Sequence, residues 1–228
     1  MILSRGRRYI FVHIPKTGGT ALALALESRA MKDDILVGDT PKARRRKRRL
    51  QGVVAAGRLW KHSTLSDIAG LASDDDIADF FVVTLVRNPW DRMVSYYHWL
   101  RGQGFDHPAV KLAQSLDFSG FLNADETRAT IAAHPYGRYV TTRAGQERCD
   151  LFIRLEHFAE DVKPFEAHLG FALAPLAAAN LSARDRDWRG YYSDADADLV
   201  GLVCGADIAR FGYRFDSTGE IAKNPPFV

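Results

Sequence analysis

The chain has 228 residues, 46% of them hydrophobic, so it can bury the core of one α/β domain that spans residues 1–228. Its formal net charge is only +3, and the segment 42–49, KARRRKRR, carries seven basic residues, so the rest of the chain sums to 3 − 7 = −4. Such localised positive charge argues against a nucleic-acid partner, which would favour basic residues spread over a groove or a helix face.

The two cysteines, Cys149 and Cys204, are too few for a disulfide framework and lack a metal-binding spacing. The opening residues, MILSRGRRYIFVHI, contain no apolar stretch long enough for a signal peptide or a membrane helix. We therefore expect a cytoplasmic protein without a metal site and without stable membrane insertion.

The stretch from Tyr9 to Glu27, YIFVHIPKTGGTALALALE, predicts a buried strand, a glycine turn and the start of a helix. Its first residues are β-branched and aromatic, which is typical of a central parallel strand. Its last seven residues favour a helix, and the N-terminus of a helix attracts anions. In the turn between them, Gly18 and Gly19 allow a tight backbone turn, and Thr17 and Thr20 supply two hydroxyl donors. The whole stretch predicts a phosphate-binding loop.

The turn is not a Walker A loop, because Lys16 precedes the glycines instead of following them. The string PKTGGT after an apolar strand resembles the 5′-phosphosulfate loop of the sulfotransferases that use 3′-phosphoadenosine 5′-phosphosulfate (PAPS), in the branch related to carbohydrate sulfotransferases. The resemblance implies that Lys16 stabilises charge on the phosphosulfate and its leaving oxygen. It also implies that residues 17–20 hold the 5′ end of PAPS.

Residues 34–38, DILVG, predict a second strand, and the basic segment 42–49 follows it. Like charges at this density repel one another, which favours a solvated loop. The alternative is a patch that holds an acidic acceptor, and the sequence leaves both interpretations open.

His62 lies in the segment 57–71, GRLWKHSTLSDIAGL, just before an expected helix that Ser63 or Thr64 would cap. A histidine at such a corner is usually structural. Members of the resembled family place a histidine in this interval, where it serves as the catalytic base. The resemblance therefore implies that His62 takes the proton of the acceptor.

Residues 80–86, FFVVTLV, give the strongest strand signal, and Arg87 follows at the end where ligands bind in open parallel sheets. The segment VRNPWDRMVSYYHWLR predicts a helix from Pro89 and resembles the 3′-phosphate motif of the same family. In that motif an arginine at a strand end and a serine eight residues later grip the 3′-phosphate, and Arg87 and Ser95 match them. A guanidinium forms charge-assisted bidentate bonds to phosphate. The alternative is an arginine paired with a carboxylate and a serine facing solvent.

The second half of the chain carries weaker signals. Short helices are expected at 108–116 and 117–123, a strand and a kinked helix within 149–170, and a last helix at 193–211. Glu156, at the end of that strand, is an alternative base. A late loop resembles one that closes near the cofactor in the family, but no role follows for its residues, Asn180, Ser182, Arg184, Arg186 and Arg189.

These patterns predict a P-loop-like three-layer α/β fold with a central, mainly parallel sheet flanked by helices. The resemblance implies a PAPS-dependent sulfotransferase that transfers a sulfuryl group, by in-line displacement with a histidine base, to a hydroxyl of a carbohydrate or other acceptor, which could be acidic. Such a transfer depends mainly on positioning and charge stabilisation. The alternatives are a nucleotide kinase-like P-loop protein, which would need Walker A order and Mg²⁺ ligands, and a non-catalytic glycan-binding protein on the same fold. The oligomeric state does not follow from the sequence.

Overall fold

The computed structural model describes residues 1–177, 184–185 and 187–215. These residues form two compact units, one made of residues 1–86 and 136–177, the other of residues 87–135, 184–185 and 187–215. Two compact units can belong to one domain, so the single domain over 1–228 stays a prediction.

The first unit is built on a five-stranded sheet with the strand order β3-β1-β2-β4-β5. The strands are β1 (Ile2–Ser4), β2 (Tyr9–Val12), β3 (Ile35–Leu36), β4 (Phe81–Val86) and β5 (Leu151–Arg154). β4 is parallel to both of its neighbours, β2 and β5, whereas β1 is antiparallel to β2 and to β3. β3 therefore runs in the direction of β2, and only β1 opposes the rest. The predicted mainly parallel sheet is confirmed.

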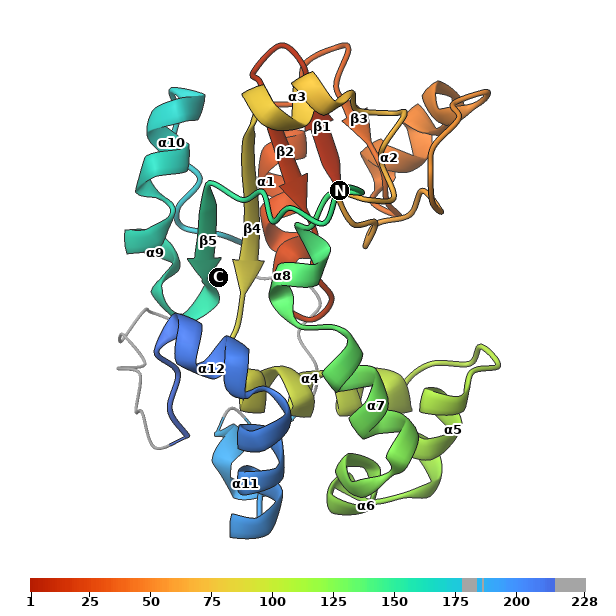
Figure 1. Cartoon of the computed structure of the whole chain (residues 1–228), viewed down its shortest axis with the longest axis vertical. Coiled ribbons are helices and arrows are strands. Elements are labelled where there is room, and N and C mark those ends of the chain that lie inside the picture. The colour runs from red at the N-terminus through yellow and green to blue at the C-terminus, as the bar shows by residue number, and fades with distance from the viewer. Residues whose placement is uncertain (178–183, 186, 216–228) are drawn as a thin grey trace. The chain divides into compact units, whose positions relative to one another are not determined.

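Both faces of the sheet are buried. On one face, Tyr9 and Phe11 of β2 belong to a core cluster with Leu22 of α1 (Gly19–Ser28) and Phe165 of α10 (Lys163–Leu169). The opposite face carries fully buried residues that alternate with these along the strands, namely Ile10, Val12, Val82 and Thr84. Figure 1 shows α1 on one side of the sheet and the segment that leads from α8 to β5 on the other. The flanked central sheet is the predicted fold.

The shorter elements of this unit are α2 (Pro41–Arg46), the 3₁₀ helix η1 (Lys47–Leu50), α3 (Asp74–Asp79), α8 (Tyr136–Tyr139), the 3₁₀ helix η2 (Leu155–His157) and α9 (Phe158–Asp161). The basic segment 42–49 is thus helical, and the interpretation of it as a loop was wrong. Thr40 caps α2 by accepting a hydrogen bond from the backbone N–H of Ala43. The expected kink near Pro164 is present, because α9 and α10 are separate helices.

The helix expected after His62 does not form, and residues 65–68 make a turn instead. The side chains of Thr64 and Asp67 each accept a hydrogen bond from the other residue's backbone N–H, at 3.1 and 2.8 Å. Gly70 then takes a φ of +97°, which helices do not contain. The reciprocal bonds are those of a capping box, which normally starts a helix. The predicted cap therefore forms, but the positive φ of Gly70 turns the chain away before a helix can continue.

The second unit is helical in the part that the structure describes. Its elements are α4 (Pro89–Arg101), α5 (Pro108–Ser115), α6 (Phe118–Asn123), α7 (Asp125–Ala133), the 3₁₀ helix η3 (Trp188–Tyr191), α11 (Asp194–Val203) and α12 (Gly205–Phe211). Asn88 caps α4 through the backbone N–H of Trp90, as the sequence predicted. The last predicted helix is interrupted at Cys204, and α7 was not predicted.

Among the described helices, none combines the length and the apolar character needed to cross a membrane. The cytoplasmic location expected from the sequence stays a prediction.

Candidate active site

The loop between β2 and α1 has an unusual backbone that favours anions. Lys16 has a φ of +64° and Gly18 a φ of +84°, whereas Thr17 between them does not take a positive φ. Alternation of this kind turns successive backbone N–H groups into one concave surface, which is a common anion-binding geometry. α1 begins at Gly19, directly after this turn, and the first N–H groups of a helix have no partner within the helix. The loop therefore presents backbone donors to a negatively charged group.

At each of the two glycines, a neighbouring side chain occupies the space that a Cβ atom would need. A Cβ atom on Gly18 would lie 2.7 Å from Cδ1 of Leu155, and a Cβ atom on Gly19 would lie 2.2 Å from Cδ2 of His13. Real Cβ atoms essentially never approach other atoms that closely. The backbone can thus reach this conformation only without side chains at both positions, which fits a cradle for a phosphate-like group.

The two threonines of the loop differ. Thr17 is fully buried, and its hydroxyl donates to the backbone oxygen of Ile14 at 2.9 Å. It therefore closes the loop, and the contact that it offers a cofactor comes from its backbone. Thr20 is half-buried and lines a pocket.

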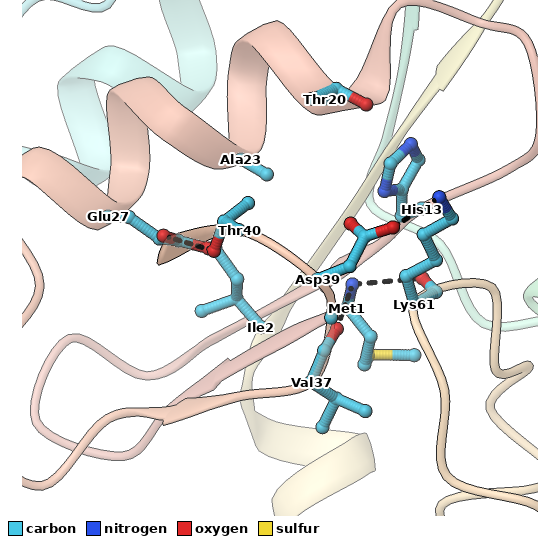
Figure 2. Close-up of a pocket in the computed structure, with 11 residues that line it drawn as sticks. Met1, Ile2, His13, Thr20, Ala23, Glu27, Val37, Asp39, Thr40 and Lys61 are labelled. Atoms are coloured by element: carbon cyan, nitrogen blue, oxygen red, sulfur yellow. Dashed lines mark hydrogen bonds and ion pairs between the residues drawn. The ribbon is translucent and has the colours of Figure 1, made fainter. Parts of the chain in front are cut away.

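That pocket lies between α1 and the segments around residues 37–40 and 61 (Figure 2). Its charged groups are largely paired. Both carboxylate oxygens of Glu27 accept from the hydroxyl of Thr40, at 2.8 and 2.7 Å, and Nζ of Lys61 donates to Asp39 at 2.7 Å. His13 borders the same pocket and was not among the residues that the sequence singled out.

His62 is attached to the start of the phosphate loop. Its Nδ1 lies 2.7 Å from the backbone oxygen of His13. A carbonyl can only accept, so Nδ1 must carry the proton, and in the neutral ring Nε2 keeps a free electron pair. The adjacent Ser63 fixes this corner, because its hydroxyl accepts from the backbone N–H of Trp60 at 2.9 Å and is itself fully buried.

Both histidines are held in the neutral form. Burial lowers the pKa of His62 to about 4, although the hydrogen bond to the His13 oxygen acts in the opposite direction. Burial also lowers the pKa of His13 well below its usual value, and the charges of Lys61 and Lys16 lower it further. At neutral pH the Nε2 atom of His62 can therefore accept a proton, which is the state that a general base requires.

In the second unit, Arg87 is paired with a carboxylate. It donates to Oδ2 of Asp91 from Nε at 2.8 Å and from Nη2 at 2.6 Å, and Nη2 of Arg184 donates to Oδ1 of the same carboxylate at 2.6 Å. The three side chains are only 14%, 16% and 11% exposed, in the order Arg87, Asp91 and Arg184. Two guanidinium groups and one carboxylate leave the cluster with an excess of one positive charge.

Two further observations in this unit bear on anion binding. Nη1 of Arg184 is buried and has no hydrogen-bond partner within the described residues, and the same holds for Nε2 of His98. Ser95 is buried rather than facing solvent, and no hydrogen bond of its hydroxyl is found in the part of the chain that the structure describes. The cluster therefore has donors that its own residues leave unused.

The structure thus brings together some of the sequence-predicted residues. Lys16, residues 17–20 and His62 share the first unit, where His13 links the loop to His62. Arg87 and Ser95 lie in the second unit, and Arg87 has the carboxylate partner of the alternative interpretation. Glu156, the alternative base, is exposed in η2. Asn180, Ser182 and Arg186 lie outside the described residues. The roles in cofactor binding stay predictions.

Sequence reasoning missed two residues of these two sites, His13 and Asp91, and it named Arg184 in the late loop without giving it a role. The spacing of Arg87 and Asp91, four residues apart, could have predicted their ion pair. No comparable signal exists for His13 and His62, which are 49 residues apart, or for Asp91 and Arg184, which are 93 apart. Within the described residues, no group of three or more His, Cys, Asp or Glu side chains is arranged to hold a metal ion.

The basic segment contains two kinds of side chain. Arg46 donates to the backbone oxygens of Met31 and Asp34 at 2.8 and 3.2 Å, Arg49 donates to that of Asp34 at 3.1 Å, and Lys42 donates to that of Glu27. These side chains attach α2 and η1 to the last turn of α1 and to the residues that follow it. Four others are exposed and make no hydrogen bond or ion pair with described residues: Arg44, Arg45, Lys47 and Arg48.

No protein-family model matches the chain, and no curated protein matches it. Among solved structures, the chain is similar to mouse sulfotransferase SULT7A1 complexed with PAP, with a TM-score of 0.49 and 18% sequence identity. The match covers 89% of this chain and 86% of that one. A similarity of this extent assigns no function to a residue, so a functional assignment has to come from the chain's own residues.

Proposed function

We propose that this protein is a sulfotransferase that uses PAPS as donor and a hydroxyl group of a carbohydrate as acceptor. The observation that carries the proposal is the hydrogen bond between Nδ1 of His62 and the backbone oxygen of His13, because it ties a neutral imidazole to the first residues of the anion-binding loop. Transfer of a charged group to a hydroxyl requires a base and an anion cradle close together.

In this proposal the backbone N–H groups of residues 17–20 hold the phosphosulfate end of the donor, and the Lys16 ammonium stabilises the charge that develops on the leaving oxygen. PAPS supplies the sulfuryl group. The acceptor oxygen forms a bond to sulfur while the bond from sulfur to the 5′-phosphate oxygen breaks, and the electron pair of that bond remains on the phosphate. The proton of the acceptor hydroxyl passes to Nε2 of His62.

Arg87 and Ser95 hold the 3′-phosphate in this proposal. The proposal is supported by the positive excess of the cluster and by the unused donor of Arg184. Since Asp91 occupies the guanidinium of Arg87, the arginine has to share or exchange this partner when a phosphate binds. A planar guanidinium suits both anions, because each accepts two parallel hydrogen bonds.

Two measurements test the function. Calorimetry compares binding of PAP, the desulfated form of PAPS, with binding of ATP and Mg²⁺, and transfer of label from radiolabelled PAPS is measured on a panel of neutral and acidic glycans. We expect PAP to bind more tightly than ATP and at least one glycan to be sulfated. Preferential binding of ATP would support a nucleotide kinase, and glycan binding without transfer in the presence of PAPS would support a non-catalytic protein.

A further inference from the structure

The ring of His13 lies where the phosphate loop and the proposed base meet. His13 directly follows β2 and is only 6% exposed. Its ring stacks on Phe11, with ring centroids 5.8 Å apart, and meets the ring of His62 edge to face, with centroids 4.7 Å apart. The same ring fills the space beside Gly19, where there is no room even for a methyl group. One side chain thus contacts both the first residue of α1 and the imidazole of His62.

Packing in the core does not explain why residue 13 is a histidine. Burial of an imidazole carries a desolvation penalty that an apolar side chain would avoid. The groups around it are Lys16, Lys61, His62 and the amino group of Met1, all of which disfavour a charged ring, and burial disfavours it more. The ring also makes no hydrogen bond with the residues that the structure describes. His13 is therefore a flat, neutral side chain, and two of the residues that it contacts, Gly19 and His62, are parts of the proposed active site.

We propose that His13 is a positioning residue that couples occupancy of the phosphate loop to the orientation of His62. This inference rests on the proposed function. The backbone oxygen of His13 fixes the protonated nitrogen of His62, and its ring supports the His62 ring from the side. Because packed interiors transmit small displacements, a shift of Gly19 on anion binding has to move the His13 ring, and with it the contact to His62. Nε2 of His62 then reaches its working orientation when the donor is bound.

The decisive readout is the imidazole of His62 itself. In protein labelled with ¹³C at histidine Cε1, the His62 resonance is assigned through its loss in His62→Gln, and PAP is titrated into the wild-type protein and the variants. We expect PAP to shift the His62 resonance in the wild type, in His13→Phe, which keeps a flat ring, and in the control His157→Ala, which changes an exposed histidine of the same unit. In His13→Ala we expect PAP to bind without shifting the His62 resonance.

Kinetics give a second readout. His13→Ala should lower kcat by about 10- to 100-fold, the typical effect of a misplaced catalytic group, while KM for the acceptor changes much less. His13→Phe should restore most of kcat. Thermal unfolding monitors the fold of each variant, and the wild-type titration gives an answer even if His13→Ala does not fold.

The outcomes separate the two proposals. If PAP binds the wild type but the His62 resonance does not respond, or if it responds equally in His13→Ala, the coupling is wrong and the sulfotransferase proposal survives. If the wild type binds no PAP and transfers no sulfate, the proposed function fails, and the coupling fails with it.

Discussion

The phosphate loop of the first unit and the arginine cluster of the second differ in what they offer to an anion. In the loop, the donors are backbone N–H groups whose directions are set by the positive φ angles of Lys16 and Gly18. In the cluster, the donors are guanidinium groups that already bind the carboxylate of Asp91. In the loop the directions of the donors are already set, and binding needs only the small shift of Gly19 proposed above, whereas the cluster has to give up or share an existing ion pair. Preorganised donors lose little on binding, and paired charges lose part of their attraction.

In the proposed reaction, this difference assigns the transfer step to the loop and the choice of nucleotide to the cluster. The loop and His62 are held by backbone geometry and a fixed tautomer, so only a small reorganisation separates them from the arrangement that the transition state requires. In the proposal the cluster exchanges one anion for another, which would suit discrimination between nucleotides with and without a 3′-phosphate. Each of the first four predictions below changes one side of this comparison and leaves the other intact, and the fifth concerns capture of the acceptor.

The largest effect is expected for His62→Ala. Loss of a general base should lower kcat about 10²- to 10⁴-fold, while the affinity for PAP, measured by calorimetry, stays nearly unchanged. Because the pKa of His62 is about 4 and the base acts when it is deprotonated, wild-type activity should be lost as the pH falls through about 4. The variant should lack this acidic limb. Near-normal turnover would transfer the role of base to another group, with Glu156 as the candidate.

Asp91→Asn tests the cluster through stability. The substitution leaves two largely buried guanidinium groups without their carboxylate, so we expect the free energy of unfolding to fall by about 3 kcal/mol in chemical denaturation. PAP should then raise the melting temperature of the variant more than that of the wild type, because its phosphate replaces the missing anion. Asp187→Asn is the matched control, since Asp187 pairs with Arg189 but is 60% exposed. Equal stabilisation of the variant and the wild type by PAP would contradict the exchange of anions.

Arg87→Ala tests selection by the 3′-phosphate. It should weaken PAP binding by about 1.5 to 3 kcal/mol, the range for a hydrogen bond to a charged group, and hardly affect the analogue that lacks the 3′-phosphate. Calorimetry with both ligands gives the comparison. Equal losses for the two ligands would mean that Arg87 supports the fold and does not bind the 3′-phosphate.

Gly19→Ala tests the preorganised loop. The new methyl group would press on the buried ring of His13, and overpacking of this kind destabilises by about 1 to 3 kcal/mol. Gly205→Ala is a matched control, because Gly205 also begins a helix but a methyl group there would meet no other atom within 4 Å. Thermal unfolding of both variants isolates the contact with His13. A similar melting temperature for the two variants would show that the loop can yield to a side chain.

Much of the fold could be predicted because its central elements carry strong patterns. The apolar runs of β2, β4 and β5 and the capped start of α4 are visible in consecutive residues. One error falls where a helix-start signal is not followed by a helix: the capping box of Thr64 and Asp67 forms, but Gly70 with its positive φ ends the turn. Three-residue strands such as β1 carry too little pattern to be recognised, and they form because a neighbouring strand supplies hydrogen bonds.

The candidate site was predictable only in its local parts. The glycine turn and Arg87 lie in short strings whose geometry follows from neighbouring residues. The partners that set their chemistry come from elsewhere in the chain: His13 fixes the tautomer of His62, and Arg184 shares the carboxylate of Asp91. Such contacts depend on tertiary packing, so no periodicity or spacing in the sequence reveals them.

The smallest effect is expected for the exposed arginines of the basic segment, which have neither a carboxylate partner nor a backbone contact among the described residues. If the carbohydrate acceptor is acidic, Arg45→Ser with Arg48→Ser should lower kcat/KM a few-fold at low salt and flatten its salt dependence, because screening shortens the range of attraction from about 10 Å at 0.1 M to about 3 Å at 1 M. Arg143→Ser with Lys163→Ser removes the same charge at exposed positions outside the segment and should change neither. Arg46 and Arg49 stay untouched, since they hold backbone oxygens. An unaltered salt dependence of kcat/KM would mean that these arginines contact solvent only and do not attract the acceptor.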